Sequence, residues 1–269
     1  MLFRSSDLVQ EVIFRWGGRV QPEPTPTPWP TWNPVAPTPT PIQGTPKVLW
    51  IVRERALPEY SRVFNFVDFF AIFAELGAEN SHLIAGSQSV TESLLDGYEV
   101  VVFGDTDSAP PLSESEQECV VQFVRGGGSI FVIGNQSLTY MVERSGIYAS
   151  SITGPFGIRF STSINGEFDH FADHPITKDV VTVLNGGSML LIESPAEAIG
   201  WTSEGEAILA VANDGYGRVV AYSDWTTFIS NPFWGLSQYS NRQFAGNIAA
   251  WLLHKEDGEP VPVEQWEIY

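Results

Sequence analysis

The chain has 269 residues, of which 14 are basic and 32 acidic, so its formal net charge is −18 at pH 7. Such a surface repels nucleic acid and anionic membranes, so we expect neither nucleic-acid binding nor membrane insertion. No apolar run approaches the roughly 20 residues of a membrane helix, and the first residues lack a signal-peptide pattern. Cys119 is the only cysteine, so no intrachain disulfide can form.

Residues 1–20 form a short apolar arm that includes Phe14 and Trp16. The spacing of its apolar residues suits one face of a short helix, and a strand is the alternative. The arm is too small to make a core alone. We therefore expect it to pack on this chain's own domain or on another chain.

Residues 21–46 form a linker with ten prolines that alternate largely with threonine. This composition favours extended polyproline II structure and excludes a helix or a central strand. Similar tethers join modules of bacterial secreted or surface proteins, so we expect an extracellular or cell-envelope location. Trp29 and Trp32 are unusual in a spacer and are candidate anchors, because a tryptophan buries a large apolar area.

The stretch from Tyr98 to Asn135 predicts a strand, a helix and a second strand. Its two apolar runs, 100–105 and 129–133, lack polar alternation, as do residues 47–52, which suits strands buried on both faces of a parallel sheet. Pro110 to Ser113 open the helix and the glycines 126–128 close it. Strand, helix and strand form a right-handed crossover unit.

The rest of the domain, 47–254, continues the alternation and predicts a flavodoxin-like, doubly wound α/β fold. Its mostly parallel sheet is followed by an antiparallel C-terminal part. Further predicted helices cover 60–76, 91–95, 138–148 and 241–253, and further strands 82–85, 190–192, 198–201, 207–212 and 217–222, with a hairpin at 213–215 and a turn at 173–177. We expect irregular structure after Phe160, and an acidic tail over residues 255–269.

Six segments carry a resemblance to a known superfamily: GYEVVVFGD, VVQFVRGGGSIFVIGN, GPFGIRFS, DHPIT, GYGRVVAYSDWTTFISN and NRQFAGNIAAWLL. In order and spacing they resemble the class I glutamine amidotransferase-like superfamily over residues 47–254. The most similar members are its non-catalytic branch of ThuA-like proteins and the domain shared by gliding-motility GldG and intraflagellar-transport proteins. The resemblance implies the fold and not the amidotransferase chemistry.

Active members of the superfamily carry a cysteine at a sharp elbow after a strand, with a histidine and a glutamate in support. The corresponding strand here ends in Asn135, Gln136 and Ser137, and no base is assigned to Ser137. Cys119 falls inside the acidic helix, where a buried structural thiol is the expectation. His174 precedes a proline and is interpreted as a turn residue, and His254 follows the last helix and not a strand. We therefore identify no catalytic residue and expect no cofactor.

A ligand site could still lie at the carboxyl ends of the strands, where open α/β sheets bind ligands. The candidate ligand-binding residues there are Asp105, Asp107, Asn135, Gln136 and Asp224. Their carboxylates and amides suit a polyol, a carbohydrate or a cation, although no spacing indicates a metal site. The alternative is that Asp105 and Asp224 cap loops and helices.

Two functions follow from these interpretations. The first is a non-catalytic binding or scaffolding module of a cell-envelope or extracellular assembly. Its arm and linker, with Phe14, Trp16, Trp29 and Trp32 as interface residues, would contact a protein partner or a neighbouring copy. The second is a ThuA-like sugar-binding or sugar-processing protein with its site at the strand ends.

Overall fold

Three apolar strands form the centre of the sheet in the computed structural model, which describes residues 44–52, 66–84, 89–105, 110–134, 142–163, 166–231 and 233–256. They are β1 (Lys47–Val52), β3 (Val100–Asp105) and β4 (Ser129–Ile133). β3 lies between the other two and pairs with both in parallel. The prediction that these apolar runs share one central sheet is therefore confirmed.

The full sheet has ten strands, with a parallel half and an antiparallel half. The parallel half has the order β2-β1-β3-β4-β12, the flavodoxin-like order, with β2 over Glu79–Ile84 and β12 over Gly217–Tyr222. The antiparallel half continues with β11 (Ala207–Asp214), β10 (Glu197–Trp201) and β7 (His170–Phe171). β9 (Ser188–Ile192) pairs with both β11 and β5 (Ile158–Ser163). The predicted fold class is thus confirmed.

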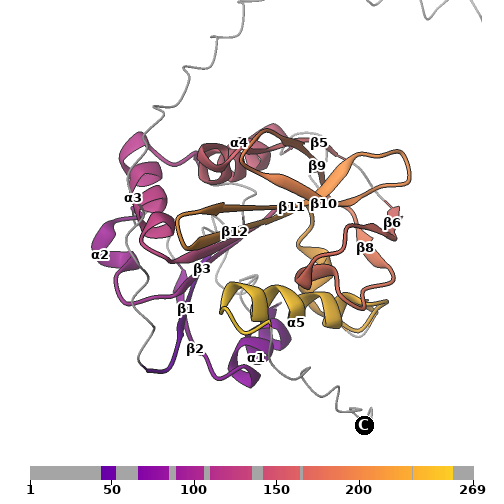
Figure 1. Cartoon of the computed structure of the whole chain (residues 1–269), viewed down its shortest axis with the longest axis horizontal. Coiled ribbons are helices and arrows are strands. Elements are labelled where there is room, and N and C mark those ends of the chain that lie inside the picture. The colour runs from indigo at the N-terminus through magenta and orange to yellow at the C-terminus, as the bar shows by residue number, and fades with distance from the viewer. Residues whose placement is uncertain are drawn as a thin grey trace, which may run out of the picture. The chain divides into compact units, whose positions relative to one another are not determined.

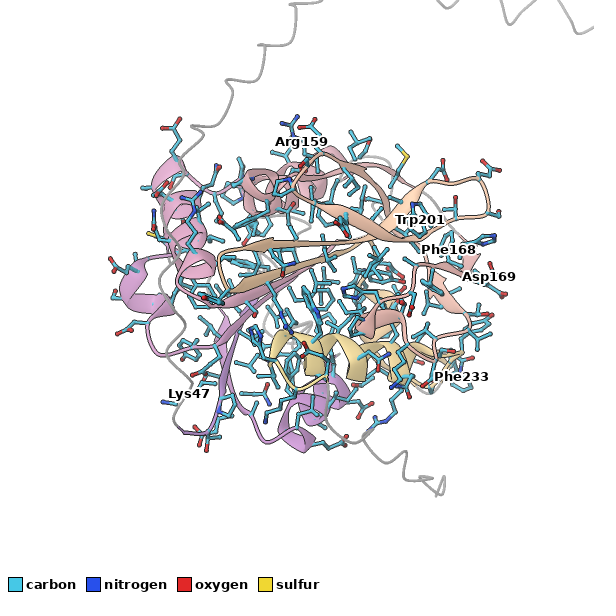
Figure 2. All side chains as sticks on the ribbon, in the orientation of Figure 1. Lys47, Arg159, Phe168, Asp169, Trp201 and Phe233 are labelled. Carbon is cyan, nitrogen blue, oxygen red and sulfur yellow. The ribbon has the colours of Figure 1, made fainter. Side chains whose placement is uncertain are left out.

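Helices cover both faces of the sheet (Figure 1). On one face lie α1 (Val67–Glu75) and α5 (Asn241–Leu252), and on the other α2 (Glu92–Leu95), α3 (Glu114–Arg125) and α4 (Val142–Thr153). Each face has its own apolar core, and Figure 2 shows side chains filling the space between the sheet and the helices. No helix in the described ranges combines the length and the apolar character needed to cross a membrane.

Local sequence signals explain where α3 begins and ends. The Ser113 hydroxyl accepts a hydrogen bond from the Glu116 amide, and the Glu116 carboxylate accepts one from the Ser113 amide, which makes a capping box. At the other end Gly127 has φ +105°, a conformation that glycine adopts without strain. α3 is therefore held at both ends before β4 begins.

The sequence predictions were wrong in two places. The helix expected over 138–148 is α4, which continues to Thr153, where the Thr153 hydroxyl donates to the Ala149 and Ile158 carbonyls. The stretch expected to be irregular after Phe160 contains strands instead, namely the end of β5, then β6 (Gly166–Phe168), β7 and β8 (Val183–Asn185). These strands are short and pair with distant partners, so no local apolar run indicates them.

Some shorter elements complete the fold. Two-stranded sheets join β6 to β8, and β13 (Ser230–Asn231) to β14 (Trp234–Gly235). The 3₁₀ helices are η3 (Gly154–Phe156), η4 (Pro175–Thr177) and η5 (Thr226–Phe228). The turn predicted at 173–177 is η4, and the predicted hairpin joins β11 to β12. α1 begins at Val67 within the expected range, whose first residues, 60–65, lie outside the described ones.

Gly217 opens β12 at a point where no side chain fits. A Cβ at this position would lie 1.9 Å from the Val124 carbonyl oxygen and 2.4 Å from that of Gly128. Gly246, inside α5, has no such neighbour within 4 Å. The two glycines therefore form a matched pair for substitution by alanine.

We predict that Gly217→Ala lowers the free energy of unfolding by about 2–3 kcal/mol, because two backbone segments must move apart. Gly246→Ala should raise it by about 0.5–1 kcal/mol, because alanine is the better helix former. Urea unfolding followed by circular dichroism measures both. Equal stabilities of the two variants would contradict the close packing of β12 against the end of α3.

Candidate functional site

The predicted ligand site lies where the parallel strands end. β1, β3, β4 and β12 are parallel neighbours, so their carboxyl ends lie at one edge of the sheet. Asp105 ends β3, but its side chain is outside the described part, as are Asp107, Asn135 and Gln136 entirely. Asp224, two residues after β12, is the one candidate whose side chain lies in the described part of the structure. A shared ligand for these five residues stays a prediction.

Asp224 is completely buried, and its carboxylate is held by the protein itself. Oδ1 accepts a hydrogen bond from the Thr226 amide at 3.0 Å, which closes a turn at the start of the 3₁₀ helix η5. Oδ2 accepts from the Gly186 amide at 3.1 Å and from the hydroxyls of Thr226 and Thr227. Asp224 thus ties the end of β12 to the loop between β8 and β9, the capping role that the sequence left as the alternative.

Burial shifts the pKa of the Asp224 carboxyl group and that of the nearby Tyr222 phenol. Burial raises the pKa of Asp224, while hydrogen bonds from Thr226, Gly186 and Thr227 act in the opposite direction. Burial and the neighbouring Asp224 raise the pKa of Tyr222 well above its usual value. The Tyr222 hydroxyl donates to the Leu184 carbonyl at 3.2 Å. A ligand could reach Asp224 only by displacing these internal partners.

The chain passes very close to itself beside Asp224. The Ser188 amide donates to the Ser223 carbonyl at 3.1 Å, and the Ser223 amide donates to the Ile208 carbonyl at 3.1 Å. A Cβ on Gly187 would lie 1.6 Å from the Ser223 carbonyl oxygen. The backbone therefore leaves no room for a bulky group between β9 and the end of β12.

A second polar cluster surrounds Trp251 near the start of β12, and no sequence pattern predicts it. The Arg218 guanidinium lies 4.7 Å from the Trp251 ring centre and makes a 2.8 Å ion pair with Glu256. The His174 ring meets the Trp251 ring edge-on at 5.4 Å. His174 Nδ1 accepts a hydrogen bond from the Ile176 amide at 3.1 Å, which caps η4. His174 is therefore a turn residue, as predicted.

The environment favours the neutral form of two histidines in this cluster. Burial, and then the positive charge of Arg218, lower the pKa of His174, against the opposing charges of Glu197, Glu256 and Asp173. Partial burial and Arg218 likewise lower the pKa of His254. In the part of the chain that the structure covers, no group of three histidine, cysteine or acidic residues could hold a metal ion.

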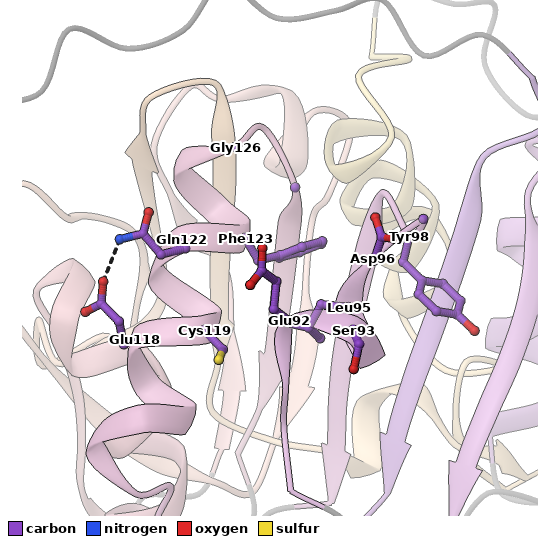
Figure 3. Close-up of a pocket in the computed structure, with 12 residues that line it drawn as sticks. Glu92, Ser93, Leu95, Asp96, Tyr98, Glu118, Cys119, Gln122, Phe123 and Gly126 are labelled. Carbon is purple, nitrogen blue, oxygen red and sulfur yellow. Dashed lines mark hydrogen bonds between the residues drawn. The ribbon is translucent and has the colours of Figure 1, made fainter.

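A groove of about 800 Å³ lies between α2 and α3 (Figure 3). Tyr98 lies two residues before β3 and Gly128 lies directly before β4, so the groove that they line is at the amino edge of the sheet, opposite Asp224. We call it the α2–α3 groove. Its deeper residues are apolar, namely Leu95, Tyr98, Cys119 and Phe123. Its exposed residues include the carboxylates of Glu92, Asp96 and Glu118.

Cys119 lines this groove, which corrects the expectation of a fully buried thiol. It is half-buried and packs against the core of the α2–α3–α4 face. The groove contains no histidine among its lining residues, and its charged residues are all carboxylates. A nucleophilic cysteine needs an electropositive setting, which this groove does not supply. The predicted interface residues Phe14, Trp16, Trp29 and Trp32 lie outside the described residues.

Comparisons with known proteins identify the fold. No family model matches the sequence, and a search of curated proteins gives no match. The mmIFT52 N-terminal domain superposes with a TM-score of 0.62 and 15% identity, over 76% of this chain and 96% of that one. The cytoplasmic protein STM1381 from Salmonella typhimurium LT2 superposes with a TM-score of 0.56 and 14% identity, over 77% of this chain and 99% of that one.

A protein from Bacteroides uniformis described as ThuA-like superposes with a TM-score of 0.49 and 14% identity, over 84% of this chain and 99% of that one. At identities this low, the similarities describe the fold alone. The mmIFT52 domain shows that this chain has the fold expected from the resemblance to intraflagellar-transport proteins.

We predict that Asp224→Ala lowers the free energy of unfolding by about 2–4 kcal/mol, because two backbone amides lose a buried acceptor. Asp224→Asn should also lower the free energy of unfolding, because an NH₂ group replaces one of the two acceptor oxygens and cannot accept a hydrogen bond from a backbone amide. The exposed Asp96→Ala should change the value by less than about 0.5 kcal/mol. Thermal unfolding at neutral pH compares all three. A stable Asp224→Ala protein would contradict the structural role of this carboxylate.

We also predict that acidification destabilises the fold through His174. Its pKa is lowered in the folded chain, so below about pH 6.5 the unfolded chain binds a proton that the folded chain does not. Stability should therefore fall as pH drops from about 6.5 through the folded pKa, by less than about 1 kcal/mol because the ring is partly exposed.

The control for this effect keeps the helix cap and removes the titration. His174→Asn retains an acceptor for the Ile176 amide and should reduce the decline in melting temperature between pH 7 and 5. Part of the decline should remain, because the pKa of His254 is also lowered in the folded chain. An unchanged decline in His174→Asn would contradict the assignment.

Proposed function

We propose that the protein is a non-catalytic binding or scaffolding module of an extracellular or cell-envelope assembly, in which the arm and linker contact a neighbouring chain. The observation that carries the proposal is the position of the only cysteine. Cys119 lies in the middle of α3, in a groove lined by carboxylates at the amino edge of the sheet. The superfamily's nucleophile belongs at the opposite edge, at the elbow after the strand that corresponds to β4.

The features of the sequence support an assembly role. The apolar arm of residues 1–20 is too small to form a core, and it is joined to the domain by a stiff linker. Asp224, the one predicted ligand-binding residue whose side chain is described, is closed by its own hydrogen bonds, which leaves the other surfaces of the domain for contacts. Attachment of one subunit's arm to the next subunit's domain is a heterologous contact, which produces rings or open filaments.

Deletion of residues 1–46 tests this function. The full chain should increase in mass with concentration in multi-angle light scattering, whereas the shortened chain should stay at the mass of one chain. Thermal unfolding of both at low concentration shows whether the shortened chain keeps its fold. A full chain that stays monomeric at every concentration, with the same melting temperature as the shortened chain, would refute the assembly role.

A further inference from the structure

The α2–α3 groove has the character of a docking surface for an apolar, basic segment. Leu95 is buried at its base, and Tyr98, Cys119 and Phe123 are half-buried, so each still presents apolar surface. Figure 3 shows the Phe123 ring reaching from α3 toward α2. This ring packs over Gly128, where a Cβ would lie 2.3 Å from it, so the ring occupies its place because residue 128 has no side chain.

Three of the exposed residues around this apolar base are acidic. Glu92 and Asp96 belong to α2 and its end, and Glu118 lies across from them on α3, where it accepts a hydrogen bond from Gln122. None of the described residues that line the groove is a lysine or an arginine. Charge complementarity therefore favours a segment that carries arginine or lysine beside apolar side chains.

The chain enters the fold at the same edge. The Lys47 amide, at the start of β1, donates to the Glu99 carboxylate, and the Glu99 amide donates to the Lys47 carbonyl at 3.0 Å. Glu99 directly follows Tyr98, a residue of the groove. Lys47 is labelled in Figure 2. The linker before Lys47 thus leaves the domain beside the groove.

The arm has the charge and the apolar content that the groove requires. The chain has 14 basic and 32 acidic residues, and residues 1–20 contain three of the basic and two of the acidic ones. The arm therefore has a formal charge of +1, and the rest of the chain has a formal charge of −19. The three basic residues are Arg4, Arg15 and Arg19, and Phe14 and Trp16 flank the second of them. Guanidinium groups next to aromatic rings suit a pocket with carboxylates around an aromatic base.

We propose that the arm of residues 1–20 docks in the α2–α3 groove of a neighbouring copy of the chain. This rests on the proposed function and identifies the surface that it uses. A linker of 26 residues, extended at ~3.1 Å per residue, spans on the order of 80 Å. A segment of this length can bring the arm to the groove of another copy.

A charge-exchange experiment on the full chain tests the proposal. The groove variant Glu92→Lys/Asp96→Lys pairs a basic arm with a groove that has lost its negative charge. The arm variant Arg4→Glu/Arg15→Glu pairs an acidic arm with an acidic groove. Each alone should self-associate about tenfold more weakly than the unchanged chain, measured by sedimentation velocity, as expected for the loss of two exposed ion pairs.

Mixing the two variants is the decisive step. The acidic arm of one variant then meets the basic groove of the other, so the mixture should form heterodimers that neither variant forms alone. Glu193→Lys/Glu204→Lys makes the same charge change at exposed residues outside the groove, and it should associate like the unchanged chain. Circular dichroism of every variant verifies that it is folded.

The outcomes separate this proposal from the function on which it rests. If the full chain does not associate at all, the assembly role fails. A second outcome is that the full chain associates and loses this association on deletion of residues 1–46, while the groove variant behaves like Glu193→Lys/Glu204→Lys. That outcome would overturn the groove assignment alone. Weakening of both variants without recovery on mixing would overturn docking between copies.

Discussion

The constraint on which this structure depends is that its central strands have no polar face. Every side chain from Val48 to Ile51, and from Val100 to Phe103, is at most 2% exposed, so both sides of the sheet must be covered. Two apolar layers meet this requirement, one below α1 and α5 and one below α2, α3 and α4. Trp50 is fully buried among aromatic rings, and its indole still donates to Asn80 at 2.9 Å.

The same constraint explains how much of the fold the sequence could predict. Unbroken apolar runs and clear helix ends indicated β1, β3, α3 and β4, because these elements are defined by the residues within them. β5 to β8 are defined by partners elsewhere in the chain, as when Ile158 pairs with Ile192 and Phe168 with Val183. Short strands of this kind have no local periodicity from which to identify them.

The candidate sites show the same division between local and distant contacts. Asp224 could be named from its position after β12, but its burial depends on Gly186 and Thr227, and on the close passage of Gly187 past Ser223. The cluster of His174, Arg218 and Trp251 joins three separate segments, and no motif in the sequence links them. The α2–α3 groove likewise exists only because two helices lie side by side.

The two edges of the sheet differ in a way that bears on function. In folds of this type the carboxyl edge usually holds the ligand, because loops and helix starts converge there. Here its one described candidate, Asp224, already accepts hydrogen bonds from two backbone amides and two hydroxyls, so its carboxyl group links segments of the fold. The amino edge carries the open groove and the point at which the linker joins β1. A contact made there would leave the carboxyl edge undisturbed.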